Sequence, residues 1–161
     1  IDYFIPAAFL ALGFGKVGAF FAGSEVGSKT HFLLRLKYVG ADGMRHLTPL
    51  YEGIFFFAGA LLAYQLLFAI RRERFQKGTN LFFFSWYVAL VYAVFDSLKG
   101  SRIFVSDSLS FNALFSYILL LTFSSYFLYY FRSSIFLFLN TYGKRIFKGF
   151  RKKAKKSHRS G

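Results

Sequence analysis

The chain has 161 residues, of which 55% are hydrophobic and 23% aromatic, and it contains no cysteine. Soluble domains average less than half apolar residues, so this composition favours an integral membrane protein of a single domain. The lack of cysteine excludes disulfides, thiolate catalysis and cysteine-ligated metals. The formal net charge is +14, which points to an anionic partner.

The cations gather in the C-terminal tail, where ten Lys and Arg residues and no Asp or Glu follow from Arg132 onward. Beside membrane spans, such a tail is more typical of contact with the anionic cytoplasmic leaflet than of nucleic-acid binding, because no base-reading module accompanies it. We therefore expect a membrane partner and no nucleic acid. The chain has no initiator Met and no cleavable signal pattern, so Ile1 is expected to begin a fragment or a processed chain.

Residues 1–22 are largely apolar, are interrupted by Lys16, and lead through several glycines to Gly23. Each glycine inside a helix costs about 1 kcal/mol relative to Ala, so these glycines predict either close backbone packing or a break. We expect a partial or re-entrant helix here. Residues 13–18 also match the G-x-G-x-x-G dinucleotide pattern, but the apolar surroundings lack the strand and the acidic residue that this fingerprint requires.

Residues 24–44 form a polar stretch, which predicts a loop outside the bilayer or along its surface; residues 31–38 fit either a short strand or an interfacial helix. A polar start at Arg45 then leads into seventeen uncharged residues, Ile54 to Ile70, which predict a membrane-spanning helix. Glu52 lies one turn inside this helix. A carboxylate at membrane depth costs a few kcal/mol, so Glu52 should face the protein interior and have a partner.

Two further spans follow, over residues 81–95 and 109–131, and the loop between the first two spans carries four cations within residues 71–78. The positive-inside rule places this loop in the cytoplasm, and the C-terminus therefore lies there too. Residues 134–151 interleave Phe with cations, which predicts a surface-lying amphipathic helix. For residues 152–161 we favour a disordered basic tail.

These segments predict an all-α polytopic membrane protein. It should contain about three transmembrane helices, a glycine-rich partial or re-entrant helix and a basic interfacial C-terminal helix. We divide it into a membrane domain, residues 1–131, and a basic cytoplasmic tail, residues 132–161.

The predicted topology brings six polar residues toward the outer half of the membrane, and they are Lys16, Arg45, His46, Glu52, Asp96 and Lys99. They fit structural ion pairs that hold the helices together. They also fit a site for an anionic lipid head group, in which cations bind the phosphate and carboxylates orient them.

Three of the polar segments resemble motifs of the prolipoprotein diacylglyceryl transferases of bacterial inner membranes. Residues 15–27, GKVGAFFAGSEVG, are similar to G-R-I-G-[NC]-F-x-x-G-x-x-x-G; residues 45–52, RHLTPLYE, to R-H-P-[ST]-Q-L-Y-E; and residues 96–100, DSLKG, to E-F-x-R-G. Residues 108–110 resemble the start of the final helix of that family. The resemblance covers residues 1 to about 131 and about the C-terminal half of such an enzyme.

The resemblance implies transfer of a diacylglyceryl group from phosphatidylglycerol to the lipobox cysteine of a prolipoprotein, without metal, nucleotide or other cofactor. It implies a multi-pass protein of the bacterial inner membrane. The candidate catalytic residues are then Lys16, Arg45, His46, Glu52 and Asp96. The candidate lipid-binding residues are Gly18, Gly23, Gly27, Tyr51, Tyr92 and Lys99.

The chain departs from the family pattern at several of these positions. Lys16 and Lys99 stand where the family has Arg, which keeps the charge but loses the bidentate fork that suits a phosphate. Ala19 replaces Asn or Cys, Asp96 shortens a Glu, and Tyr92 falls where the family has a second Arg. The family's His-Gly-Gly-Leu segment would lie upstream of Ile1, and His46 is a substitute candidate for the base. The alternative is a catalytically impaired relative that binds anionic lipid or a lipoprotein.

Overall fold

The computed structural model describes residues 1–40, 42–100, 103–106 and 109–132. The chain divides into two compact units, residues 1–123 and 124–161. In chain order, the first unit contains the following helices and strands, in which η marks a 3-10 helix: η1 (Asp2–Phe4), α1 (Ile5–Ala22), β1 (Arg35–Leu36), β2 (Arg45–His46), α2 (Thr48–Arg71), α3 (Thr79–Phe95), η2 (Asp96–Leu98), β3 (Phe104–Ser106) and β4 (Leu109–Ser110). A further helix, Phe111–Arg132, begins in the first unit and continues into the second.

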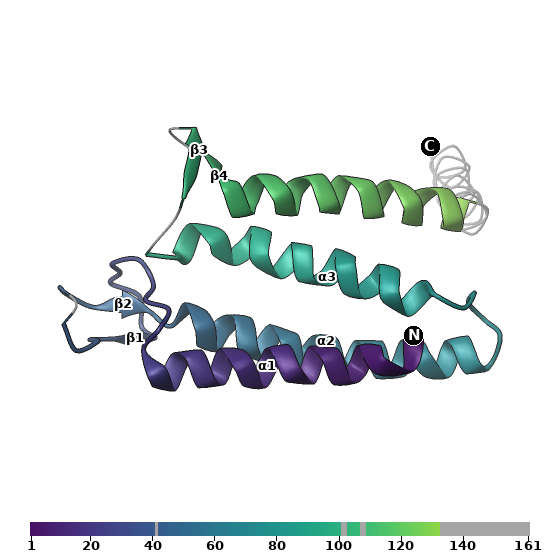
Figure 1. Ribbon diagram of the computed structural model, residues 1–161, viewed down its shortest axis with the longest axis horizontal. Coiled ribbons are helices and arrows are strands. Elements are labelled where there is room, and N and C mark those ends of the chain that lie inside the picture. Colours follow the sequence, from purple (N-terminus) through teal and green to yellow (C-terminus); the bar gives the residue numbers. More distant parts are fainter. Residues whose placement is uncertain (41, 101–102, 107–108, 133–161) are drawn as a thin grey trace, which may run out of the picture. The chain divides into compact units, whose positions relative to one another are not determined.

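The helices of the first unit run alongside one another, with α1 packed most extensively on α2 and α2 packed on α3 (Figure 1). Successive helices run in opposite directions. As a result, the end of α1, the start of α2 and the end of α3 lie together near β1 and β2 (Figure 1). We call this the hairpin end. The buried core between the helices is formed mainly by Phe9, Phe56, Ala60, Tyr87 and Val91.

Four helices within the described residues are long and apolar enough to cross a membrane: Asp2–Ala22, Thr48–Arg71, Thr79–Leu98 and Phe111–Arg132. The prediction of an all-α polytopic membrane protein is therefore confirmed, and the last three helices match the predicted spans. Residues 35–36 form a short strand paired antiparallel with β2, which decides between the two readings of that stretch. The predicted amphipathic helix and basic tail lie outside the described residues, which end at residue 132.

The glycine-rich N-terminal segment differs from its prediction, because it is a continuous helix and not a partial or re-entrant one. α1 runs without a break until Gly23, whose backbone adopts the left-handed conformation (φ +63°) that ends the helix. Close packing is the physical reason for one of the glycines. A Cβ added at Gly13 would lie 2.7 Å from the ring of Phe57 on α2. At Gly15 and Gly18 an added Cβ would meet nothing within 4 Å.

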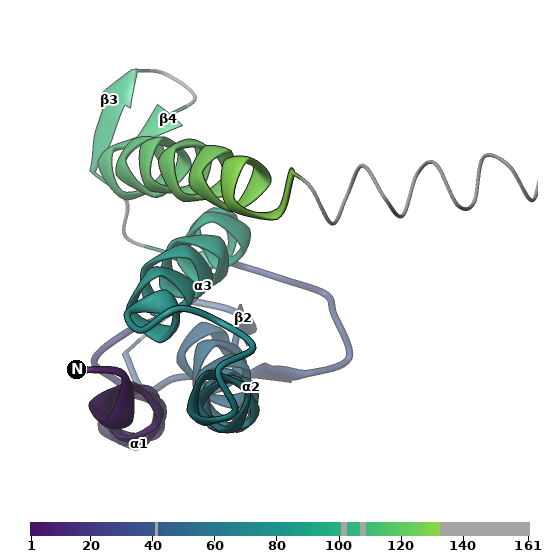
Figure 2. The ribbon, with the colours of Figure 1, turned by 90° about the vertical axis from the view of Figure 1, so that its right-hand side faces the viewer.

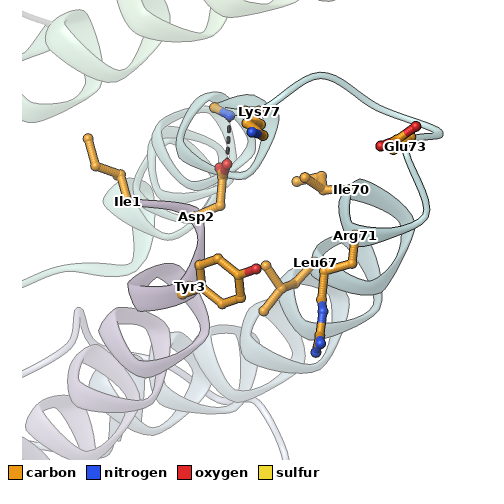
Figure 3. Close-up of a pocket in the computed structure, with 9 residues that line it drawn as sticks. Ile1, Asp2, Tyr3, Leu67, Ile70, Arg71, Glu73 and Lys77 are labelled. Atoms are coloured by element: carbon orange, nitrogen blue, oxygen red, sulfur yellow. Dashed lines mark hydrogen bonds between the residues drawn. The ribbon is translucent and has the colours of Figure 1, made fainter.

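At the other end of the bundle, the Asp2 carboxylate holds the start of α3 (Figure 3). It accepts hydrogen bonds from the backbone N–H groups of Gly78 (2.6 Å) and Asn80 (3.1 Å), so a side chain next to α1 caps the N-terminus of α3. Beside this contact lies a cavity of about 680 Å³, whose walls include Tyr3, Arg71 and Lys77 (Figure 3). The Asp2 carboxylate therefore fastens the start of α3 to the beginning of the chain.

Gly59 on α2 tests the packing of the core. A Cβ there would lie 2.9 Å from the rings of Phe9 and Tyr87, both of which are buried. We expect Gly59→Ala to lower the free energy of unfolding by about 1–3 kcal/mol through overpacking. Gly15→Ala is the matched control and should raise it by up to about 1 kcal/mol, because helix propensity improves in open space. Unfolding midpoints in detergent micelles measure both, and equal shifts for the two variants would contradict this packing.

Candidate functional site

Three segments that are far apart in the sequence are joined by backbone hydrogen bonds at the hairpin end. Residues 27–29 lie in the middle, with antiparallel bridges from Gly27 to Lys99 on one side and from Lys29 to Arg45 on the other. The N–H of Ser28 donates to the carbonyl of Leu98 (2.8 Å), and the N–H of His46 donates to the carbonyl of Ser28 (3.1 Å). This ladder brings together the three sequence motifs at 15–27, 45–52 and 96–100.

Two motif glycines permit this close approach of backbones. A Cβ at Gly27 would meet the His46 carbonyl oxygen and would lie 2.8 Å from the Thr48 hydroxyl. A Cβ at Gly100 would lie 2.6 Å from the carbonyl oxygen of Val26. Backbone atoms cannot move aside cheaply, so glycine is required at both positions. The structure thus gives Gly27 a packing role.

Through Lys99 the ladder is connected to a group of ionic side chains centred on Glu52, whose side chain is 0% exposed. The Nζ of Lys16 lies 2.7 Å from Glu52 Oε2, and the Nζ of Lys99 lies 3.1 Å from Oε1. Lys16 also donates to both carboxylate oxygens of Glu25, at 2.7 Å each. We call Lys16, Glu25, Glu52 and Lys99 the charged cluster. Its two ammonium groups and two carboxylates balance, which lets the charges be buried together.

The aromatic ring of Tyr92 on α3 lies beside both cations of the cluster. Its centroid is 4.7 Å from the Nζ of Lys99 and 5.6 Å from the Nζ of Lys16, distances at which cation–π attraction operates. The side chains of Lys16 and Lys99 are only 12% and 18% exposed, whereas that of Glu25 is 41% exposed. Of the four ionic groups, Glu25 is therefore the one most open to the solvent.

Sequence reasoning did not select Glu25 as a site residue. The available signal was its position within the 15–27 motif, two residues before Gly27, in a chain with only seven acidic residues. An acid at that place needs a nearby cation, and the helical turn and loop that bring it back onto Lys16 are visible only in the structure.

Asp96 takes part in a different set of contacts. It is buried, and its Oδ2 accepts a hydrogen bond from the Ser110 hydroxyl. The Ser110 hydroxyl in turn accepts from the N–H of Ala113 (3.1 Å) and so caps the helix Phe111–Arg132. Among the described residues no ion pair joins Asp96 to the charged cluster. Asp96 therefore anchors the last described helix to the end of α3.

Arg45 and His46 form β2, which is one side of the ladder. The Nη1 of Arg45 donates to the carbonyl of Gly27 (3.2 Å), and the His46 ring lies between those of Phe32 and Tyr51, with centroids 6.1 and 6.4 Å away. Arg45 Nε and His46 Nδ1 are buried and lack a hydrogen-bond partner within the described part of the chain. Buried nitrogens of this kind are where a water molecule or a ligand is expected.

The other predicted lipid-binding residues are spread around the hairpin end. The Tyr51 hydroxyl donates to the carbonyl of Leu34 (2.7 Å) and so ties the loop before β1 to α2. Gly18 lies on α1 with open space beside it, and Gly23 ends that helix. The described residues contain no group of three or more His, Asp or Glu side chains that lie close enough to hold a metal ion.

The family model of prolipoprotein diacylglyceryl transferase matches residues 1–130, which include the charged cluster and the whole ladder. No curated protein and no solved structure matches the chain significantly.

Glu52 should be the most sensitive position of the cluster. Glu52→Gln keeps the shape of the side chain but leaves the two ammonium groups without their central anion. We expect the free energy of unfolding to fall by about 3–5 kcal/mol, the range for breaking one side of a buried ion pair. Glu73→Gln, in the exposed loop after α2, should change it by no more than about 0.5 kcal/mol. Similar losses for the two variants, measured by denaturation in detergent, would contradict the central role of Glu52.

Proposed function

Since this chain belongs to the prolipoprotein diacylglyceryl transferase family, we propose that it transfers a diacylglyceryl group from phosphatidylglycerol to the lipobox cysteine of a prolipoprotein. The family is one of transferases in lipoprotein biosynthesis, and the candidate membrane-spanning helices fit a multi-pass bacterial membrane protein. The choice of phosphatidylglycerol as donor is part of the proposal, as is the inner membrane with the hairpin end facing outward.

The reaction is a substitution at a glyceryl carbon. The sulfur of the acceptor cysteine forms a bond to the carbon of the diacylglyceryl group that carries the phosphate, and the carbon–oxygen bond to that phosphate breaks. Glycerol phosphate leaves with the electron pair, and the thiol proton goes to a base. The enzyme must therefore stabilise growing negative charge on the leaving phosphate and accept one proton.

The observation that carries the proposal is the pair of ammonium groups around Glu52. Lys16 on α1 and Lys99 just after η2 both reach this one buried carboxylate, so their positions are set before any lipid binds. Two cations held in place in a poorly hydrated site are suited to a phosphate that gains charge in the transition state. Glu52 then acts as the positioning residue for both.

Glu25 is the group that the phosphate would replace on Lys16. Its carboxylate occupies the same ammonium through two 2.7 Å contacts and is far more exposed than Glu52. Exchange of one anion for another on Lys16 costs less than pairing a new anion with a fully hydrated cation, because the ammonium is already largely desolvated. The two candidate bases for the thiol proton are the displaced Glu25 carboxylate and the Nδ1 of His46, which has no hydrogen-bond partner among the described residues.

The alternative function is that of an impaired relative which binds anionic lipid or a lipoprotein without turnover. One observation favours it: all three ion pairs of the charged cluster are internal, and Tyr92 supplies a ring where the resemblance implies a third cation. Such a cluster can hold three helices together without any substrate. The two functions differ in whether a thioether product forms.

The transferase assay uses the protein in phosphatidylglycerol liposomes with a lipobox-cysteine peptide, and mass spectrometry detects the diacylglyceryl thioether. We expect product from the unaltered protein. Lys99→Met should lower kcat by about 10²–10³, the cost of removing one donor to the developing charge, while Lys16 still pairs with Glu52. Lys77→Met, in the exposed loop before α3, is the control and should keep full activity. A folded protein that binds phosphatidylglycerol but forms no product would establish the alternative.

Tyr92→Arg tests whether the site is an attenuated form of the family's site. An Arg there would add a third cation beside Lys16 and Lys99 and give the cluster a net positive charge, which favours a phosphate. We expect kcat/KM in the same assay to rise. Tyr92→Phe keeps the ring and should leave kcat/KM close to its original value. A fall in activity for Tyr92→Arg with an unchanged unfolding midpoint would contradict the attenuated-site interpretation.

A further inference from the structure

The loop between α1 and α2 exposes an unusual amount of apolar surface. We call residues 29–46 the hairpin loop, since β1 and β2 pair within it. Leu33 is 89% exposed and Val39 is fully exposed, and the other exposed large apolar side chains of this loop are Phe32, Leu34, Leu36 and Met44. In water such a cluster is unfavourable, so a surface of this kind marks a contact site.

Two side chains tie the hairpin loop to the neighbouring helices. Among residues 31–40 only Tyr38 is buried, and its ring lies 3.8 Å from where a Cβ of Gly23 would be. Burial raises the pKa of the Tyr38 hydroxyl above its ordinary value, with a further contribution from nearby Tyr51, so this anchor is neutral at physiological pH. The Tyr51 hydroxyl binds the carbonyl of Leu34. The exposed side chains are therefore presented by a fixed scaffold.

The position of the hairpin loop places it at the membrane surface. It lies between Ala22, the last residue of α1, and Thr48, the first residue of α2, which are limits of two candidate membrane spans. Figure 2, viewed along the helices, shows the loop between α1 and α2 extending sideways beyond α2. A segment that reaches sideways at the end of a span lies over the lipids that surround the helix.

The charges of the hairpin loop suit an anionic surface. Lys29, Arg35 and Lys37 are exposed together with the apolar side chains, and the single acidic residue of the loop is Asp42. Basic residues next to anionic head groups attract a protein segment to the membrane surface. Apolar side chains flanked by cations are the composition of segments that lie within the interface of a bilayer.

We propose that the hairpin loop inserts its apolar side chains, led by Leu33 and Val39, among the head groups of the leaflet at the hairpin end, with Lys29, Arg35 and Lys37 on anionic lipid phosphates. This contact would fix the height of the charged cluster relative to the lipid phosphates. It would also gather anionic lipid beside the cluster. The inference does not depend on the proposed transferase activity, because it concerns a surface and not the reaction.

The absence of cysteine makes the test direct, since a single introduced cysteine is the only thiol that a nitroxide label can modify. Labels are placed by Leu33→Cys and Val39→Cys, both fully or largely exposed positions where a label does not disturb packing. Asp42→Cys, at an exposed polar position of the same loop, is the matched control. The protein is reconstituted in vesicles of phosphatidylglycerol and phosphatidylcholine. Collision of each label with oxygen, which enters the bilayer, and with a water-soluble nickel chelate then measures its depth.

We expect labels at 33 and 39 to lie about 5–10 Å below the level of the phosphates, the depth typical of surface-lying amphipathic segments, and the label at 42 to remain in water. Vesicles of phosphatidylcholine alone should bring the labels at 33 and 39 closer to the water. Equal access of the nickel chelate to all three labels would overturn the proposal. So would spin–spin broadening with shielding from both collision partners, which would mean that a second copy covers the loop. Burial that occurs only after a lipobox peptide is added would assign the surface to the acceptor instead.

Discussion

A carboxylate that is buried in a membrane-spanning helix must be compensated, and the pairing of Glu52 with two lysines is the contact on which the hairpin end depends. Glu52 comes from α2, Lys16 from α1 and Lys99 from the residue after η2, so one side chain ties α2 both to α1 and to the segment that follows α3. Lipid offers no hydrogen bonds in place of a lost partner. Each helix is therefore constrained in depth and rotation by the position of that carboxylate.

The backbone ladder and the charged cluster support each other. The ladder places Lys99 opposite Gly27, and Gly27 follows Glu25 by two residues. The ladder therefore brings Lys99 and Glu25, which pair with Glu52 and Lys16, close to each other. Without glycine at 27 and 100 the strands of the ladder could not approach closely enough. The 15–27 motif thus supplies both the glycine that the ladder requires and two residues of the charged cluster, Lys16 and Glu25. This is why a glycine-rich motif can be a structural requirement of a site without contacting its ligand.

The substitutions at Lys16, Lys99 and Tyr92 form a consistent set. An ammonium group is compact, and two of them fit against one carboxylate and one aromatic ring. Two planar guanidinium groups would need more space and would use their fork-shaped donors less well on a shared carboxylate. The ring of Tyr92 fills the space beside the two cations. The chain therefore places two ammonium groups and a ring at positions where the family resemblance implies three Arg side chains.

Much of the fold follows from composition and period alone. The three spans, the loop at 71–78 and the need for a partner for Glu52 were predictable, because the bilayer sets helix length and penalises buried charge. Tertiary structure was needed to show that α1 is continuous, since glycines favour a break and close packing equally well in a sequence. It also separated Asp96, which anchors a helix, from Glu52, which pairs with the lysines, and it added Glu25 to Lys16. Sequence alone determined that a carboxylate at membrane depth, Glu52, must have a partner. Only the folded chain decided which pairs form, because that choice depends on how closely the backbones of distant segments can approach.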